Sequence, residues 1–194
     1  MNTSNEVNLD QFAADVDLYH EQLVMLYWQP LKAFILSRTG SLQDAEDIVQ
    51  EAFIRAYLAL DHYTLEQIQT LKVRPWLYKI TWNVFCNHVK RSKLSSQVYL
   101  EALEENSPFE QNQLSDEHPE LAFEQVERRQ ELETLVATLP QNYRVPVSMY
   151  YFEELRYREI AEILQQPVGT VKVYVHRGIQ MLRKALTIPR NEVR

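Results

Sequence analysis

Apolar side chains recur at the spacing of an α-helix through residues 45–60, and this pattern constrains the fold more than any other feature of the chain. Ser41 precedes Asp44 by three residues, which resembles the start of a helix with a capping box. The apolar positions then follow at i, i+3, i+4 and i+7: Ala45, Ile48, Val49, Ala52, Phe53, Ala56, Tyr57 and Leu60. This spacing predicts an amphipathic helix that buries these side chains.

The rest of the chain also favours helices, and we predict an all-α fold. Only three glycines occur in 194 residues, and strong helix formers dominate the periodic segments. Proline cannot donate the hydrogen bond of a helix interior, so a kink or break is expected at Pro30. Further helices are predicted at about 16–38, 74–93, 121–139, 142–152, 157–164 and 168–186. We therefore expect two small helical domains, residues 1–93 and 121–194, joined by an acidic linker over 94–120.

The net charge of −7 is unevenly distributed along the chain. Residues 1–93 carry −2, residues 94–139 carry −9 and residues 140–194 carry +4. Because phosphate attraction depends on local clusters of Lys and Arg, the acidic total does not exclude binding to nucleic acid. We interpret the linker as a solvated tether, although its charge also permits it to occupy a basic groove as a mimic of nucleic acid.

Several classes of protein are disfavoured by composition. Cys86 is the single cysteine, which excludes an intramolecular disulfide and fits a reducing cytoplasm. The five histidines are scattered, so neither a metal site nor a cofactor is expected. No catalytic residue is assigned, because no nucleophile, metal partner or phosphate loop accompanies the carboxylates. The first residues lack the pattern of a signal peptide, and no uncharged stretch approaches the ~20 residues of a membrane span, so we expect an intracellular protein without membrane insertion.

The last two predicted helices have the spacing of a helix-turn-helix. A short break at Gln165–Pro167 separates them, and the small Ala161 allows a close crossing. The apolar faces consist of Tyr157, Ile160, Ala161 and Leu164, and of Val171, Val175, Ile179 and Leu182. The opposite face of the last helix is basic without any acid: Thr170, Lys172, Val173, His176, Arg177, Gln180, Arg183 and Lys184. Such a face suits the major groove of DNA, but helical hairpins with basic solvated faces also occur in proteins that never bind DNA.

Residues 74–93 form a second basic helix with no acid. Lys79, Asn83, Asn87 and Lys90 share one face, while Trp76, Leu77, Ile80 and Val84 are better placed for the core. Trp82 and Phe85 are ambiguous. Trp82 either packs internally or stacks on an unpaired base, an interaction of about 1–3 kcal/mol per base.

The helix over residues 42–60 carries a polar face opposite its apolar one: Asp44, Glu46, Asp47, Gln50, Glu51 and Arg55. Paired carboxylates occur in acid-base catalysts. Acidic residues near a helix amino terminus ordinarily complement the helix dipole, however, and each stabilises by roughly 0.3–1 kcal/mol.

Three segments carry distinctive motifs: DAEDIVQEAFIRAY, the run WLYKITWNVFCNHVKRSK, and nearly fifty residues that include EIAEILQQPVGTVKVYVHR. Together they resemble one family of proteins, the extracytoplasmic-function (ECF) sigma factors of bacterial RNA polymerase. The resemblance implies a dissociable, non-enzymatic subunit that directs promoter-specific initiation. Its implied partners are core RNA polymerase, promoter DNA and an anti-sigma factor, and its implied location is the cytoplasm.

The resemblance also implies three sets of binding residues. The upstream promoter element is contacted by Arg156, Thr170, Lys172, Tyr174, His176 and Arg177. The minus-ten element is contacted by Lys79, Trp82, Asn83, Asn87, Lys90 and Arg91, with base capture in the loop over 61–73. Core polymerase is contacted by Asp44, Glu46, Asp47, Gln50, Glu51 and Arg55. The first domain is thus assigned to polymerase binding and melting, and the second to upstream recognition.

Three residues depart from the family pattern. Pro146 falls inside a helix, where it predicts a local distortion, and Val173 and Tyr174 replace a small and a basic residue, which removes one phosphate contact. Two alternatives remain. A stand-alone helix-turn-helix regulator would dimerise through the first half and bind duplex DNA without polymerase, whereas a helical interaction module or enzyme would bind neither.

Overall fold

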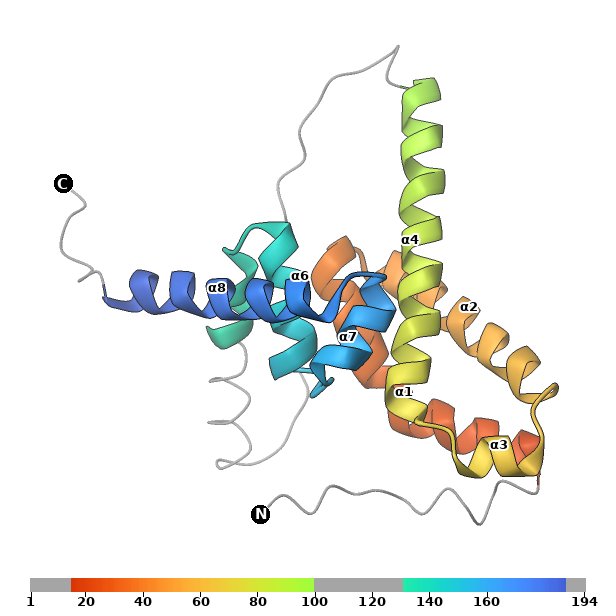
Figure 1. The fold of residues 1–194 in the computed structure, drawn as a ribbon. Coiled ribbons are helices and arrows are strands. Elements are labelled where there is room, and N and C mark those ends of the chain that lie inside the picture. The colour runs from red at the N-terminus through yellow and green to blue at the C-terminus, as the bar shows by residue number, and fades with distance from the viewer. Residues whose placement is uncertain (1–14, 100–130, 188–194) are drawn as a thin grey trace, which may run out of the picture. The chain divides into compact units, whose positions relative to one another are not determined.

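The computed structural model describes residues 15–99 and 131–187, with side chains over 15–92 and 131–186. The chain divides into two compact units, residues 1–112 and 113–194. Within the described ranges every regular element is a helix (Figure 1), so the all-α prediction is confirmed there. Residues 100–120 of the predicted linker (94–120) and residues 121–130 of the next predicted helix lie outside the described part.

The first unit begins with two helices, α1 (Val16–Thr39) and α2 (Leu42–Leu60). The Asp15 carboxylate caps α1 by accepting from the backbone N–H groups of Asp17 and Leu18 at 3.0 and 3.2 Å. Gly40 ends α1 in the left-handed region, with φ 67°, a conformation that glycine adopts at little cost. Ser41 then caps α2 by accepting from the N–H of Asp44 at 3.2 Å, as predicted.

The break considered at Pro30 does not occur, because α1 runs through it from Val16 to Thr39. Pro30 is exposed, whereas Leu23, Leu31 and Phe34 are buried. The apolar contacts on both sides of the proline therefore outweigh the single missing hydrogen bond.

The predicted loop over 61–73 contains a short helix, α3 (Leu65–Gln69). Thr64 caps it in a reciprocal arrangement: its hydroxyl accepts from the Gln67 N–H at 3.3 Å, and the Gln67 side chain accepts from the Thr64 N–H at 2.8 Å. Ile68 is its one buried side chain. The next helix, α4 (Val73–Tyr99), continues six residues beyond the predicted end at residue 93, so the first part of the expected linker is helical.

The core of the first unit forms where α2 packs against α1 and α4. All the predicted apolar positions of α2 except Tyr57 are buried. Tyr78 of α4 is also buried and lies edge-on to Phe34 of α1, with ring centroids 4.9 Å apart. Thr81, fully buried beside them, donates its hydroxyl to the Leu77 carbonyl at 2.9 Å. Neither Tyr78 nor Thr81 was assigned to the core from the sequence.

The second unit contains helical residues 131–137, followed by α6 (Gln141–Tyr151), α7 (Tyr157–Leu164) and α8 (Val168–Thr187). The bounds of α6, α7 and α8 lie within one residue of those predicted. Pro146 is buried inside α6, and the helix continues across it rather than ending. Part of the core of this unit is an apolar cluster of Val136, Leu139, Val147 and Leu182, with Leu135, Tyr143, Phe152 and Ile179 at its margin.

The predicted helix-turn-helix consists of α7 and α8. Gln165 reverses the chain after α7 in the left-handed conformation, with φ 53° and ψ 45°. Ala161 is buried, in agreement with a close helix crossing, and α8 packs against both α6 and α7. Because α8 rests on two helices along one side, its other side faces solvent.

Candidate functional site

The solvent face of α8 is made by the residues that the sequence placed there. Val171, Val175 and Leu182 are buried and anchor the helix to the second unit. Thr170 is half-buried, and the rest of the predicted face is exposed: Lys172, Val173, His176, Arg177, Gln180, Arg183 and Lys184. The Gln180 side-chain amide is hydrogen-bonded to His176 Nε2 at 3.0 Å, which orients both side chains on this face. The polar side of α8 is therefore exposed to solvent and could insert into a groove of a binding partner.

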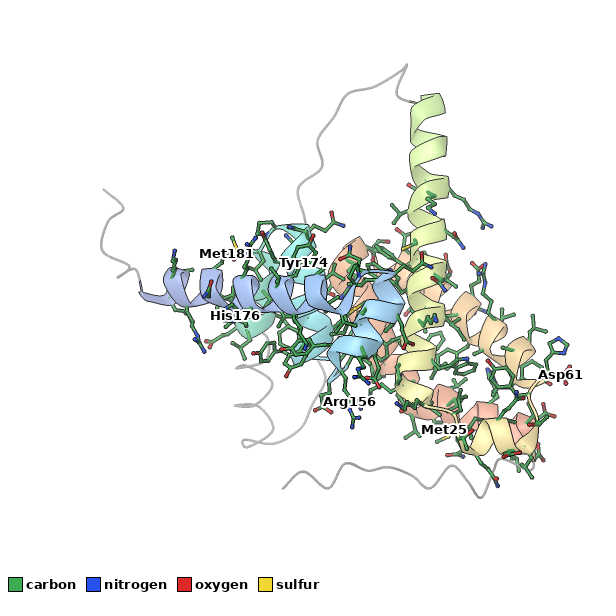
Figure 2. The ribbon with its side chains drawn as sticks, viewed as in Figure 1. Met25, Asp61, Arg156, Tyr174, His176 and Met181 are labelled. Carbon is green, nitrogen blue, oxygen red and sulfur yellow. The ribbon has the colours of Figure 1, made fainter. Side chains whose placement is uncertain are left out.

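Tyr174 does not share that face, although it was grouped with the residues that contact DNA. Its side chain (labelled in Figure 2) is half-buried. It lies edge-on to Tyr143 of α6, with ring centroids 5.5 Å apart. The reason is helical register: Tyr174 is three residues after buried Val171 and four before buried Gly178, which places it on the inner side. Its main contact is therefore within the domain.

Arg156 lies at the amino-terminal end of α7, away from the face of α8. Its backbone is extended, and its N–H donates to the Glu159 carboxylate at 2.8 Å. The side chain is exposed (Figure 2). The structure thus leaves this guanidinium accessible next to the helix-turn-helix.

The predicted polar face of α4 is present in the first unit. Lys79, Asn83, Asn87 and Lys90 are all exposed, and so is Arg91, whereas Leu77 and Val84 are buried on the opposite side. Two amides and two ammonium groups therefore line one edge of a single rigid helix, spaced by three or four residues. Such a row presents hydrogen-bond donors and positive charge with no competing carboxylate.

The Trp82 side chain packs against other aromatic residues of the first unit and does not project fully into solvent. It is half-buried, with its ring centroid 5.3 Å from Phe85 and 6.4 Å from Phe34. Phe85 is itself buried. These contacts support the packing alternative for Trp82 over the base-stacking one, because the ring already has aromatic partners.

The polar residues of α2 do not form one surface. Asp44 lies 3.6 Å from His88 of α4, and Glu46 lies 3.6 Å from Lys32 of α1. The two carboxylates point to opposite flanks because residues two apart are turned by about 200° around a helix. Glu51 pairs with Arg55 one turn later in the same helix.

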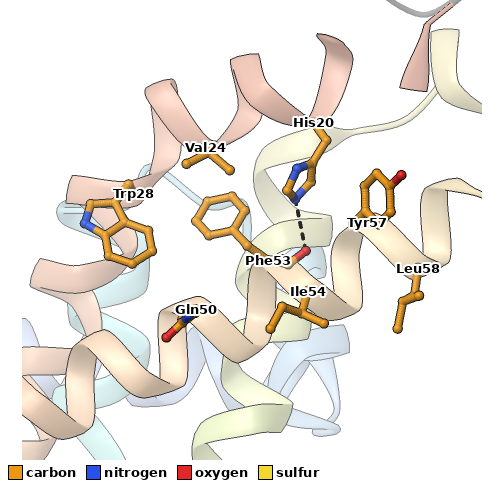
Figure 3. Close-up of a pocket in the computed structure, with 8 residues that line it drawn as sticks. All are labelled: His20, Val24, Trp28, Gln50, Phe53, Ile54, Tyr57 and Leu58. Carbon is orange, nitrogen blue, oxygen red and sulfur yellow. Dashed lines mark hydrogen bonds between the residues drawn. The ribbon is translucent and has the colours of Figure 1, made fainter. Parts of the chain in front are cut away.

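Asp47 and Gln50 are exposed at the centre of the α2 face. Two exposed apolar residues extend this face towards the end of the helix. Ile54 and Leu58 are 54% and 57% exposed. Together with α1 they line a shallow groove of about 370 Å³, shown in Figure 3: His20, Val24, Trp28, Gln50, Phe53, Ile54, Tyr57 and Leu58. Across its floor, His20 Nε2 is hydrogen-bonded to the Phe53 carbonyl at 3.1 Å.

Tyr57, predicted as a core residue, is at the end of this groove and is exposed. Its hydroxyl donates to the Asp17 carboxylate at 2.7 Å. That hydrogen bond, and the carboxylate charge, raise the pKa of Tyr57 above its usual value. The prediction was wrong because the first turns of α1 offer Tyr57 a polar partner at the margin of the core.

The described residues hold no group of three or more His, Cys, Asp or Glu arranged to bind a metal ion. Cys86 is free and partly buried, and this burial raises the pKa of its thiol. None of the helices in the described ranges has the length and apolar character needed to cross a membrane.

Two family models match the chain in separate places. The model for sigma-70 region 2 matches residues 23–94, and the model for sigma-70 region 4 matches residues 129–182. The ECF RNA polymerase sigma factor SigW of Bacillus subtilis is 35% identical over 181 residues, which covers 91% of this chain and 89% of SigW. The chain is an ECF sigma factor.

Other relatives agree with this assignment. RNA polymerase sigma-H factor of Pseudomonas aeruginosa is 33% identical, over 84% of each chain. Among solved structures, the sigma factor RpoE from Bartonella quintana, crystallised with the anti-sigma factor NepR, matches with a TM-score of 0.63 at 20% identity. That match covers 88% of this chain and 98% of RpoE, and at this identity it shows a shared fold.

The region 2 match covers most of α1 and α4 and all of α2 and α3, and the region 4 match covers α6, α7 and most of α8. A stand-alone regulator is therefore not favoured, because both halves of this sigma factor match sigma regions. Ile54 and Leu58 were not predicted as exposed residues of the α2 face. Both lie outside the buried stripe of α2, and that off-stripe position was the available signal.

Proposed function

We propose that this sigma factor uses three exposed helix faces, each for a different binding role. The α2 face around Asp47 and Gln50 binds core RNA polymerase, the α4 face recognises and opens the minus-ten element, and the α8 face reads the upstream element. The observation that carries the proposal is the coincidence of the two basic, acid-free faces with the regions matched by sigma-70 models.

The polymerase-binding part of the proposal rests on α2. Asp47 and Gln50 are exposed, and the apolar Ile54 and Leu58 extend the same side of the helix. A surface with an apolar centre and a polar margin is typical of protein interfaces. We therefore add Ile54 and Leu58 to the proposed set. We assign Asp44 and Glu46 to its edges because their partners lie on the neighbouring helices α4 and α1, whereas Asp47 accepts a hydrogen bond from Gln43 of α2 itself at 3.0 Å.

The DNA-binding parts rest on charge and on exposure. The exposed groups of α4 and α8 include five basic residues whose positions were predicted to meet DNA: Lys79, Lys90, Arg91, Lys172 and Arg177. Holding a base outside the duplex must offset a few kcal/mol of unpairing and unstacking. Free protein is thus expected to bind promoters poorly, and the holoenzyme to bind them well.

We also propose where this sigma factor acts and how it is regulated. It acts in the cytoplasm, where core polymerase is found, and it makes and breaks no covalent bond. RpoE of Bartonella quintana was crystallised with an anti-sigma factor. We propose that an anti-sigma factor also holds this chain, and that it competes with core polymerase. Capture of the tagged chain from its host should yield such a protein, and adding core polymerase should displace it.

The main test is co-purification with bacterial core RNA polymerase, followed by run-off transcription on fragmented DNA from the host. Capture of polymerase together with new promoter-specific transcripts is the expected result. Binding of duplex DNA without polymerase would instead favour the stand-alone regulator.

A charge reversal tests the α2 face. Asp47→Lys should weaken association with core polymerase by about tenfold or more, because a new cation meets a surface selected for an anion. Glu66→Lys, an equal charge change at an exposed position of α3, is the matched control and should leave core binding unchanged. Full core affinity of Asp47→Lys would remove this face from the proposal.

A further inference from the structure

Val173 occupies an unusual place on α8. It lies one turn after Thr170 and one turn before Arg177, in the middle of the face proposed to read the upstream element. Its side chain is 44% exposed, whereas the valines two residues before and after it, Val171 and Val175, are almost fully buried. Val173 therefore contributes little to the core of the domain.

The side chain of Val173 is also fixed in direction. A β-branched residue in a helix keeps essentially one χ1 rotamer, so its two methyl groups cannot fold back onto the domain. Its neighbours on the face are polar or charged: Lys172, His176 and Arg177. The result is a small apolar spot inside a surface otherwise built from hydrogen-bonding groups.

The chemistry of the major groove restricts what such a spot recognises. The edges of the base pairs present hydrogen-bond donors and acceptors there, and one apolar group, the C5-methyl of thymine. In helix-turn-helix proteins the amino-terminal residues of the second helix contact the base edges. Val173 lies in the second turn of α8, which begins at Val168.

We propose that Val173 determines specificity by contacting the methyl group of a thymine in the upstream element. The inference rests on the proposed function of α8 and adds a base preference to it. Val173 has no group that can hydrogen-bond, so its contribution depends on the methyl group alone. The proposal thereby gives a role to a residue that departs from the family pattern.

The test removes that methyl group from the DNA. The probe is a promoter duplex, obtained from the run-off experiment, in which each upstream thymine is singly replaced by 2′-deoxyuridine. Holoenzyme containing the full chain is titrated against each duplex. Replacement at one position should weaken binding by the unmodified sigma factor roughly fourfold, because burying one methyl contributes about 0.8 kcal/mol.

Val173→Ser should lose this discrimination and bind the thymine and deoxyuridine duplexes equally. Met181→Ser is the matched control: Met181 is 41% exposed on the same helix but lies two turns further from its start, and the variant should keep the discrimination. Both positions are on the surface, so the variants should fold, which their circular dichroism can verify.

Two results would overturn the inference. One is a deoxyuridine scan with no sensitive position, and the other is a sensitive position at which Val173→Ser still discriminates. In either case, the holoenzyme is also tested for preference for the intact upstream element over a scrambled one. If that preference is retained, the proposed function of α8 is still supported. Loss of that preference in the unmodified protein would instead overturn the function of α8 and the inference together.

Discussion

Gly178 of α8 lies directly against Val147 of α6, so closely that a Cβ atom on Gly178 would be 2.6 Å from Val147 Cγ2. Val147 is buried and β-branched, so its methyl group has little freedom to move aside. The helix crossing beneath the proposed DNA-reading face therefore depends on the absence of a side chain at residue 178.

Gly178→Ala is expected to destabilise the protein by about 1 kcal/mol. The gain in helix propensity is close to 1 kcal/mol, but overpacking in a filled core costs about 1–3 kcal/mol. Thermal unfolding measures the difference. Gly169→Ala is the control, because nothing lies within 4 Å of its new Cβ, and it should not lower the midpoint. An unchanged midpoint for Gly178→Ala would show that α6 and α8 separate easily.

Gln165→Gly is expected to stabilise the protein by about 0.5–1 kcal/mol. Gln165 adopts the left-handed conformation, which strains a residue with a side chain by roughly 1–2 kcal/mol, while glycine adds a smaller entropic cost. The unfolding midpoint should rise. Gln166→Gly, at a neighbour without positive φ, should lower it or leave it unchanged. A fall for Gln165→Gly would mean that its side chain makes a stabilising contact.

Lys172→Ala is expected to weaken promoter binding and to reduce its dependence on salt. Each cation that neutralises a phosphate contributes about 0.9 to the slope of log affinity against log salt concentration. The slope measured for the holoenzyme should therefore fall by about that amount. Lys32→Ala serves as control, because the Lys32 ammonium faces Glu46 in the first unit. An unaltered slope would exclude a phosphate contact by Lys172.

Asn83→Ala is expected to slow promoter opening by about tenfold, the effect of losing roughly 1.4 kcal/mol of hydrogen bonding to a captured base. The rate can be followed by 2-aminopurine fluorescence in the minus-ten element. Ser92→Ala, another exposed polar position of α4, should open promoters at the normal rate. If Asn83→Ala opened promoters as fast as the unmodified protein, the α4 face would need a different role.

Much of the fold could be predicted because helix formation is a local property. The caps at Ser41 and the turn at Gln165–Pro167 were readable from residue type and spacing, and the predicted bounds of α7 are those observed. The short α3 was missed because five residues carry too little periodicity to distinguish a helical turn from a loop. Of the kink or break predicted at Pro30, the break does not occur, because buried side chains on both sides of the proline hold one continuous helix.

The candidate site was predictable where exposure follows from helical spacing alone, as on α4 and α8. The exposure of site residues was harder to predict where two helices pack against each other. Trp82 and Tyr174 each found an aromatic partner on another helix, Phe34 and Tyr143 respectively. Those contacts depend on how helices cross, which no single segment records.

The helical character of the chain and its two basic faces without acid could be inferred from the sequence alone, because side chains three or four residues apart share a face of a helix. The resemblance to sigma factors was likewise readable from the sequence motifs. Which of the borderline positions are covered depends instead on how the helices pack against one another. Tyr57 is exposed, Trp82 is half-buried and Gly178 is enclosed, because packing depends on what the neighbouring helix brings to that point.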